Sequence, residues 1–236
     1  MGQFYAFCGK SYRKFMHEGV KSPVFKKYTV AGGGYKKNVK CPHCQSTDRT
    51  RLLYLFFKLR TDIYRNKTRL LHISPNMLLA RELQSIPTVE YTCGALTPEC
   101  FSPFNAVKVD VSKMTFDENS FDVIVCNHVL EHVPDDATAM REIFRVLKPG
   151  GFAVLQVPLA LDLEKTLEDE TITGRKERKI VFGQTDHLRL YGVDYFDKLS
   201  SIGFRVVRDN PFADNWADDL ERYSLDRNED VFVCYK

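Results

Sequence analysis

The sequence lacks any apolar run long enough to span a bilayer. It also lacks a secretory signal, because its first residues, MGQFYAFCGKSYRKF, contain neither an apolar core nor a cleavage site. Both absences argue against a membrane-spanning or secreted protein, and we expect a soluble protein of the cytoplasm. In that compartment the seven cysteines are expected to be reduced thiols or metal ligands rather than disulfides.

Acidic residues are scarce in the first part of the chain. Residues 1–69 contain 3 acidic residues against 16 lysines and arginines, whereas the remaining 167 residues contain 28 against 18. The positive charge either neutralises the second part or attracts an acidic partner, such as a phosphorylated glycan, a nucleotide-linked sugar, an anionic membrane surface or RNA. Aromatic residues alternate with lysines in KKYTVAGGGYKKNVK, but no recognisable RNA-binding motif accompanies them, which argues against nucleic acid.

The most informative stretch lies in the middle of the chain, at residues 120–158. Two short, mostly apolar segments, residues 122–126 and 152–157, are typical of parallel strands covered on both faces. Between them, apolar residues recur at helical spacing and can pack on the sheet. This stripe consists of Met140, Ile143, Phe144 and Leu147. Pro149 and Gly150 are expected to end the helix. The pattern predicts half of a Rossmann-like sheet.

This stretch resembles the middle of a class I S-adenosylmethionine-dependent methyltransferase of the methyltransferase-11 type, in the spacing of FDVIVCNHVLEHV to REIFRVLKPGG. The resemblance extends through FGQTDHLRLYG and the terminal segments GFRVV and VFVCYK. The chain is similar to a bacterial subgroup whose head ends in CPxCxSxxRxRLL, here CPHCQSTDRTRLL. The resemblance implies an α/β fold in which residues 61–236 form a Rossmann-like, doubly wound, mostly parallel seven-stranded sheet. Residues 1–60 would form a basic, zinc-ribbon-like head with a connecting helix.

The resemblance implies three zinc ligands in the head, Cys8, Cys41 and Cys44. The last two form a CPHC knuckle, whose spacing allows both thiolates to reach one tetrahedral zinc ion. In the subgroup a first knuckle supplies two further cysteines, whereas here the earlier position is Tyr5, a poor zinc ligand. Either His17 or His43 completes the site, or the metal has been lost and aromatic packing holds the ribbon.

The loop after the first strand, residues 69–73, contains no glycine. Class I methyltransferases usually have a glycine-rich loop here, because backbone amides approach the methionine portion of the cofactor. The resemblance to the subgroup's HxAPE loop implies four cofactor-binding positions, which are His72, Ser74, Pro75 and Asn76. A Ser-Pro turn that opens a helix over residues 77–85 can still direct amides at a carboxylate.

The second and third strands supply the nucleoside contacts in this family. The second strand, residues 89–92, should end near an acid that accepts hydrogen bonds from both ribose hydroxyls, but the matching position is Ala95. Loss of these bonds is expected to cost about 2–4 kcal/mol of cofactor affinity. After the third strand, Asp110 matches the carboxylate that accepts the adenine amino group, and Val111 matches the adjacent amide. The alternative for Asp110 is a turn cap.

Two polar residues, Asn127 and His128, follow the fourth strand and match cofactor-binding positions at the face where methyl transfer takes place. Transfer to a hydroxyl also needs a base within reach of the acceptor's proton. His128 is one candidate for this base. His132, on the following loop, is a second candidate and is expected to support the fold or contact the acceptor.

The segment GQTDHLRLYG carries the remaining candidates. The resemblance places His187 on the substrate side as a catalytic base, with Asp186 or Arg189 orienting it or binding an anionic acceptor. In the alternative, Asp186, His187 and Arg189 form an internal hydrogen-bonded turn that covers the sheet.

Two motifs of DNA methyltransferases are absent, the Asp/Asn-Pro-Pro-aromatic tetrapeptide and a cysteine nucleophile after proline. We therefore expect a small-molecule or saccharide acceptor, methylated on a hydroxyl, and the subgroup implies the tailoring of bacterial surface glycans. The alternative is a relative without cofactor that binds an acidic partner, a phosphorylated glycan or RNA, through its basic head. A third hypothesis is an RNA methyltransferase whose head binds RNA in a salt-sensitive way.

Overall fold

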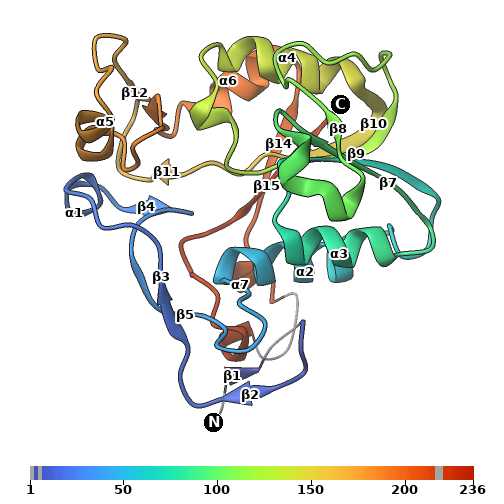
Figure 1. The fold of residues 1–236 in the computed structure, drawn as a ribbon, viewed down its shortest axis with the longest axis horizontal. Coiled ribbons are helices and arrows are strands. Elements are labelled where there is room, and N and C mark those ends of the chain that lie inside the picture. Colours follow the sequence, from blue (N-terminus) through green and yellow to red (C-terminus); the bar gives the residue numbers. More distant parts are fainter. Residues whose placement is uncertain (1–2, 5–6, 216–219) are drawn as a thin grey trace.

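The computed structural model describes residues 3–4, 7–215 and 220–236, and its centre is a seven-stranded sheet between two layers of helices (Figure 1). The sheet consists of β6 (Thr68–Ile73), β7 (Val89–Ala95), β8 (Val107–Lys108), β9 (Phe121–Cys126), β10 (Leu147–Val154), β14 (Arg205–Asp209) and β15 (Val231–Tyr235). Its strand order is β14-β15-β10-β9-β6-β7-β8. Only β15 runs against its neighbours, β10 and β14. The predicted doubly wound, mostly parallel sheet is confirmed.

Helices cover both faces of the sheet. On one face lie α2 (Asp48–Arg60) and α3 (Met77–Ser85), and on the other lie α4 (Asp136–Val146) and α6 (Tyr195–Ile202) (Figure 1). The remaining helices of the described residues are short, namely α1 (Val24–Lys27), α5 (Arg175–Val181), α7 (Pro211–Asp214) and the 3-10 helices η1 (Pro98–Phe104), η2 (Leu130–His132) and η3 (Leu220–Tyr223). Within the described residues, no helix has both the length and the apolar character that crossing a bilayer requires.

The helix α2 packs into the core of the sheet domain. Its side chains Leu53 and Phe57 are buried with Val123 and Val233 of the sheet. Thr47 caps the helix, because its side chain accepts a hydrogen bond from the backbone N–H of Thr50. The helix expected over residues 49–60 was assigned to the head as a connection, and in the structure it covers one face of the sheet together with α3.

The helix α4 ends before the Pro-Gly-Gly sequence that was expected to end it. The last helical residue is Val146, and Leu147 already begins β10. The register between β10 and β9 shifts between Leu147 and Phe152, so the proline and the glycines form an irregularity inside the strand. Gly150 has a φ of +79°, a conformation that glycine adopts at little cost.

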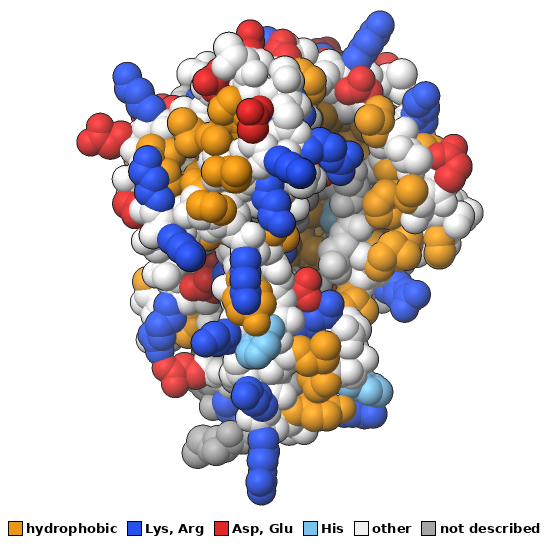
Figure 2. Space-filling model, turned by 60° about the vertical axis from the view of Figure 1, so that its left-hand side comes forward, with side chains coloured by type: hydrophobic (Ala, Val, Ile, Leu, Met, Phe, Trp, Pro, Cys, Tyr) orange, Lys and Arg blue, Asp and Glu red, His pale blue; other side chains and the backbone are white. Residues whose placement is uncertain are grey.

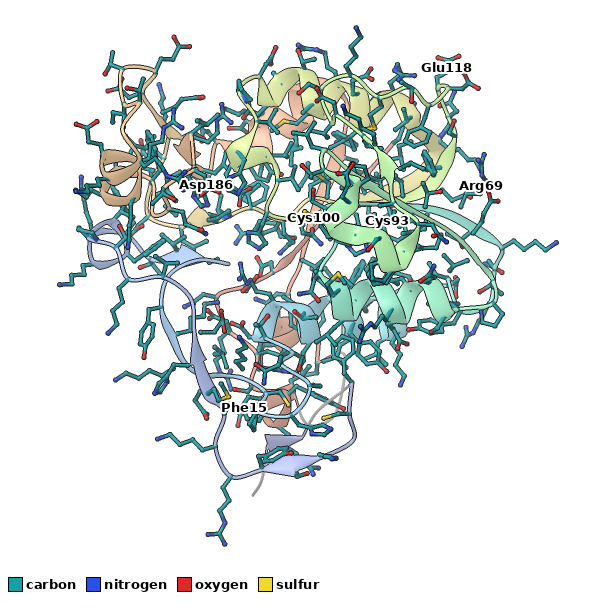
Figure 3. All side chains as sticks on the ribbon, viewed as in Figure 1. Phe15, Arg69, Cys93, Cys100, Glu118 and Asp186 are labelled. Carbon is teal, nitrogen blue, oxygen red and sulfur yellow. The ribbon has the colours of Figure 1, made fainter. Side chains whose placement is uncertain are left out.

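The head consists of short paired segments. These are β1 (Gln3–Phe4) with β2 (Ser11–Tyr12), and β3 (Met16–Glu18) with β5 (Lys36–Lys40). A further head strand, β4 (Val30–Ala31), pairs with β11 (Leu159–Ala160), and β12 (Leu167–Glu168) pairs with β13 (Arg189–Leu190). Because β4 pairs with a segment that follows β10, the head is joined to the carboxyl side of the sheet. Phe15 lies in the small core of the head (Figure 3).

Candidate functional site

The strands β6 and β9 are neighbours at the point where the order of strands in the sheet reverses. Ligands of doubly wound sheets bind at the carboxyl ends of the strands at such a point. Ser74 follows β6 and His128 follows β9, with positive φ values of 46° and 55°. The backbone N–H of Ser74 donates to the Gly94 carbonyl, and that of His128 donates to the Gln156 carbonyl, each at 2.8 Å. These bonds hold the two loops in a left-handed backbone conformation that is unfavourable for most residues other than glycine.

Two cavities adjoin at Ser74 and His128, which line both. The first, the apolar cavity, has a volume of about 730 Å³ and is lined mainly by aliphatic side chains, namely Ile73, Leu96, Val109, Val111, Val129, Val133 and Pro134. The second, the polar cavity, has a volume of about 450 Å³ and includes Glu18, Lys40, Gln45, Thr47, Arg49, Thr50, Asn127, Gln156 and Glu229. Figure 2 shows a deep hollow on the face that carries the head, with lysine and arginine side chains beside it.

The loop after β6 supplies Pro75 and Asn76 to the wall of the polar cavity. The Asn76 side-chain oxygen accepts hydrogen bonds from the backbone N–H groups of Leu78 and Leu79, at 3.1 and 3.3 Å. Asn76 is thus the N-cap of α3, and it occupies two of the amides that would otherwise be directed at a carboxylate.

His72 also lies at the polar cavity but is buried within β6. Its Nδ1 lies 3.1 Å from the Tyr91 hydroxyl. Burial lowers the pKa of His72 to about 3, so the ring is neutral at physiological pH.

Of the three residues expected to contact the nucleoside, Asp110 and Val111 line the apolar cavity and Ala95 does not. One carboxylate oxygen of Asp110 accepts a hydrogen bond from the Ser112 backbone N–H at 2.9 Å, so Asp110 caps a turn. Its second carboxylate oxygen has no hydrogen-bond partner among the described residues. Val111 lines the same cavity. Ala95 is buried and does not line it, whereas the next residue, Leu96, does and is 64% exposed. Neither Ala95, the position expected for the ribose-binding acid, nor Leu96 beside it offers a carboxylate.

Arg49 is a site residue to which the sequence analysis assigned no role. Its guanidinium donates to the Gly32 carbonyl at 2.7 Å and lies 3.0 Å from Nε2 of His128. Because a guanidinium can only donate, Nε2 is the acceptor and Nδ1 carries the proton. That Nδ1 lies 3.4 Å from the Glu131 carboxylate. Burial and the nearby guanidinium lower the pKa of His128, which keeps the ring neutral.

Asn127 lies beside His128 and holds the neighbouring strand. Its side-chain oxygen accepts a hydrogen bond from the Gln156 backbone N–H at 3.1 Å. The Gln156 side chain in turn bonds to backbone groups of Asp230 and Phe232. Asn127 lines the polar cavity and also fixes the edge of the sheet there.

His187 is buried and, among the described residues, is not part of the lining of either cavity. Its Nδ1 lies 3.2 Å from the Phe182 carbonyl, and its ring is 4.8 Å from that of His132, centroid to centroid. Asp186, labelled in Figure 3, lies 3.4 Å from Nδ1 of His132. His132 and Asp186 line the apolar cavity. Asp186 is therefore paired with His132, not with His187 as the sequence analysis considered.

Arg189, which was expected to bind an acceptor, is buried and makes internal hydrogen bonds. Its guanidinium is buried and donates to the backbone carbonyls of Leu130, Val133 and Pro134 and to the Glu168 carboxylate. These bonds hold the turn after β9 against β13. These contacts favour the alternative in which Asp186, His187 and Arg189 belong to an internal hydrogen-bonded turn.

The head brings its three candidate zinc ligands together. The sulfur atoms of Cys8, Cys41 and Cys44 lie within 4.8 Å of one another. The backbone N–H groups of His43 and Cys44 donate to the Cys41 sulfur at 3.2 and 3.1 Å, so the knuckle is already formed. Neither of the histidines considered as a fourth ligand joins this group within the described part of the chain, and Tyr5 lies outside the described residues.

A methyltransferase-domain family model matches residues 58–155. The chain is similar to sterol 24-C-methyltransferase of Kluyveromyces lactis, with 35% identity over 119 residues, which are 48% of this chain and 30% of that protein. It is also similar to arsenite methyltransferase of Aquipseudomonas alcaligenes, with 31% identity over 107 residues, which are 44% of this chain and 29% of that protein. These matches therefore span less than a third of each relative.

Solved structures share the fold. An S-adenosylmethionine-dependent methyltransferase from Mesorhizobium loti has a TM-score of 0.51 and 16% identity, over 78% of this chain and 95% of that chain. A chain from the complex between the Haloferax volcanii Trm112 methyltransferase activator and a methyltransferase has a TM-score of 0.50 and 15% identity, over 80% and 92%. The methyltransferase-domain model thus matches residues 58–155, and the observed sheet has the class I, Rossmann-like fold that these solved structures share.

Proposed function

We propose that this chain transfers a methyl group from S-adenosylmethionine to a polar small molecule, with a saccharide hydroxyl as the preferred acceptor. The observation that best supports this proposal is that the apolar and polar cavities adjoin at Ser74 and His128. Methyl transfer is an in-line displacement, so cofactor and acceptor must occupy adjoining spaces. When bound, S-adenosylmethionine supplies an electrophilic methyl group on a positively charged sulfur.

The apolar cavity fits the nucleoside part of the cofactor. The aliphatic side chains of Leu96, Val109 and Val129 offer surfaces on which a purine ring can pack. The unpartnered oxygen of Asp110 would accept a hydrogen bond from the adenine amino group, and Val111 would offer its amide. Because Ala95, the position expected for the ribose-binding acid, carries no carboxylate, we expect the cofactor to bind more weakly than in relatives with an acid there.

Arg49 would hold the carboxylate of the methionine part. It is a half-buried guanidinium at the wall of the polar cavity, close to the loop after β6. Asn76 already caps two of the amides at the start of α3, so the helix terminus alone offers fewer donors than usual. A guanidinium binds a carboxylate through two parallel hydrogen bonds and compensates for that loss.

We assign the role of general base to His128 in preference to His187. His128 lines both cavities and is neutral, and the Glu131 carboxylate orients its protonated Nδ1. Its Nε2 becomes free to accept the acceptor's proton only when the Arg49 guanidinium turns away from it. His187 is buried too deeply to reach an acceptor in either cavity.

The lining of the polar cavity supports a polar acceptor. Its charged and hydroxyl side chains, Lys40, Thr47 and Glu229 among them, offer hydrogen bonds to a sugar. A sterol, the methyl acceptor named for one relative, would leave these groups unpaired at a cost of about 1–3 kcal/mol each.

The proposal is tested by following S-adenosylhomocysteine formation with the full chain, S-adenosylmethionine and a panel of monosaccharides, sugar phosphates and nucleotide-linked sugars. We expect turnover with one of these classes and a loss of roughly 100-fold or more in kcat for His128→Ala, as is usual for a removed general base. His17→Gln, an exposed position in the head, is the matched control and should retain full activity. Equal turnover of both variants would rule out the assigned role of His128.

The second candidate function is a cofactor-deficient protein that binds an acidic partner through its head. Two features favour it: no acid stands at Ala95, the position expected to bind the ribose, and residues 1–69 carry an excess of positive charge. It predicts no heat on titration with S-adenosylhomocysteine, together with salt-sensitive binding of a phosphorylated glycan or RNA by the full chain.

The three head thiols would hold a structural zinc ion. The preformed knuckle at Cys41 supports this proposal, because backbone amides directed at a sulfur stabilise the thiolate that zinc requires. Metal analysis of the purified chain tests it, with Cys44→Ser expected to lower the zinc content.

A further inference from the structure

Two buried polar atoms close to the apolar cavity have no hydrogen-bond partner among the described residues. They are Oε2 of Glu131 and Nε2 of His187, and both side chains are 1% exposed. An unpaired buried donor or acceptor costs about 1–3 kcal/mol, and more when it is charged. Two such atoms in one place indicate that something not made of this chain's own atoms pairs with them.

A third side chain, His132, completes a cluster with these two. One ligand atom of each of Glu131, His132 and His187 lies within 4.8 Å of the others. The cluster is held rigidly, because the Leu188 backbone N–H donates to the Glu131 carbonyl at 2.8 Å. Glu131 and His132 belong to a 3-10 turn after β9, and His187 precedes β13. This hydrogen bond joins two segments that are far apart in the sequence, and it keeps the three candidate ligand side chains close together.

The surrounding contacts orient these side chains as ligands. Nδ1 of His187 lies 3.2 Å from the Phe182 carbonyl, which can only accept, so Nδ1 carries the proton and Nε2 carries the lone pair. On His132, Nδ1 lies 3.2 Å from the Asp186 carbonyl and 3.4 Å from its carboxylate. Ligand histidines in metal sites make such contacts to carbonyls and carboxylates with their other ring nitrogen.

We propose that Glu131, His132 and His187 form a binding site for a divalent transition-metal ion. Two imidazoles and one carboxylate are typical of zinc, iron and manganese sites, whereas calcium and magnesium prefer sites made of oxygen alone. Three protein ligands leave at least one coordination position open. His132 also lines the apolar cavity, so the proposed site adjoins the space in which a small molecule could bind.

This site is chemically distinct from the thiol cluster of the head. The head offers three sulfur ligands, Cys8, Cys41 and Cys44, which favour zinc and other thiophilic ions. The Glu131 cluster offers nitrogen and oxygen ligands, which also accept Mn²⁺. Binding of Mn²⁺ therefore reports on the Glu131 cluster without interference from the head. The inference stands whether or not the chain transfers methyl groups.

The experiment uses the full chain, dialysed against a chelator, and measures the loss of the free Mn²⁺ signal by electron paramagnetic resonance during titration. We expect one bound Mn²⁺ per chain. His132→Gln, at a half-buried position, should weaken binding by more than the roughly 10- to 100-fold that is typical for the loss of a residue that only contacts a metal ligand. His17→Gln is the control and should bind as the wild type does.

If the wild-type chain binds no Mn²⁺, or if His132→Gln binds it as tightly as His17→Gln does, the cluster is not a metal site. A crystal soaked in MnCl₂ that shows only a water molecule between Glu131 and His187 would have the same meaning. Circular dichroism of each variant shows whether it is folded, and Glu131→Gln, which keeps the side chain's size, serves as the second ligand variant.

Discussion

At the scale of single residues, His72 is a titratable group held neutral by its surroundings. Burial lowers its pKa to about 3 from an ordinary value of 6.5. Between these values an unfolded chain takes up a proton at this position and the folded chain does not, so folding stability decreases as the pH falls. Above pH 6.5 the ring is neutral in both states and contributes no pH dependence.

We therefore expect His72→Gln to flatten the acid limb of the stability curve. Each pH unit below the unfolded pKa costs the wild type about 1.4 kcal/mol through this residue, and a glutamine cannot take up the proton. Urea denaturation at a series of pH values from about 6.5 to about 4.5 measures the difference, which should reach roughly 2–3 kcal/mol. Identical slopes for the two proteins would show that His72 is protonated in the folded state.

Arg49 is the residue on which the proposed cofactor affinity most depends. Arg49→Met removes the cation at the polar cavity and should weaken S-adenosylhomocysteine binding by about tenfold, or 1.4 kcal/mol. Arg65→Met, at an arginine whose side chain is 84% exposed, is the control and should leave the affinity unchanged. Calorimetric titration of both variants measures the effect, and equal affinities would remove Arg49 from the site.

At the scale of secondary-structure elements, α2 joins the sheet domain to two other parts of the chain through Arg51. This side chain is fully buried. Its guanidinium donates to the carbonyls of Ser46 and Val39, each at 2.8 Å, and to those of Tyr223 and Ser224 at 2.6 and 3.1 Å. One cation thus fixes α2 against the end of β5 and against the segment before β15.

Arg51→Met should destabilise the protein by about 3 kcal/mol or more, because it leaves several buried carbonyls without donors. Arg51→Lys should lie between the wild type and the methionine variant, since lysine keeps the charge but lacks the planar arrangement of donors. Equilibrium denaturation of the three proteins measures this order. A methionine variant as stable as the wild type would show that the guanidinium makes no net contribution.

The elements that the sequence predicted well are those with a local signal. The strands around β6, β7 and β9 and the helix α3 follow from apolar runs and helical periodicity. The end of α4 was predicted too late, because β10 begins at Leu147 and takes the Pro-Gly-Gly sequence into the strand. The strand pairing that competes with the helix at that point is a tertiary interaction, which no local pattern reports.

The site residues that the sequence missed belong to distant segments. Arg49 reaches His128 because α2 packs beside the carboxyl end of β9, and that packing has no local signature. For Arg189 and His187 the sequence left two alternatives open, because a polar residue in a loop can bind a ligand or make internal hydrogen bonds, and only the structure shows that both are buried. The sequence did contain one indication of these roles, the Arg49-Thr50-Arg51 sequence shortly after the CPHC knuckle. Arg49 lies in the wall of the polar cavity and Arg51 is buried in the core.

At the scale of the whole molecule, the head is attached to the sheet domain by a buried ion cluster. The Lys36 ammonium lies 2.9 Å from Asp48, 2.8 Å from Asp226 and 3.2 Å from Glu229. These carboxylates come from α2 and from the segment before β15. Although burial alone would lower the pKa of Lys36, the three carboxylates raise it above its ordinary value, so the lysine stays charged. Lys36 occupies a place that three acids would otherwise offer to a metal ion.

We expect Lys36→Met to destabilise the protein by about 3–5 kcal/mol, because removal of one partner leaves buried charges uncompensated. Lys37→Met, at the exposed neighbour in the same strand, is the control and should change stability by less than about 0.5 kcal/mol. Urea denaturation measures both. A second change, Glu229→Gln, should restore part of the stability lost in Lys36→Met, and the absence of any rescue would argue against the cluster as the attachment.

The central claim is that the apolar cavity at the ends of β6 and β9 holds the nucleoside of S-adenosylmethionine, with the methionine part reaching Arg49, although Ala95 replaces the ribose-binding acid. Calorimetric titration of the full chain with S-adenosylhomocysteine tests it most directly, with Asp110→Ala as the site variant. We expect saturable binding of one ligand per chain that Asp110→Ala weakens by about tenfold. No heat at millimolar ligand, or equal binding by the variant, would contradict the account.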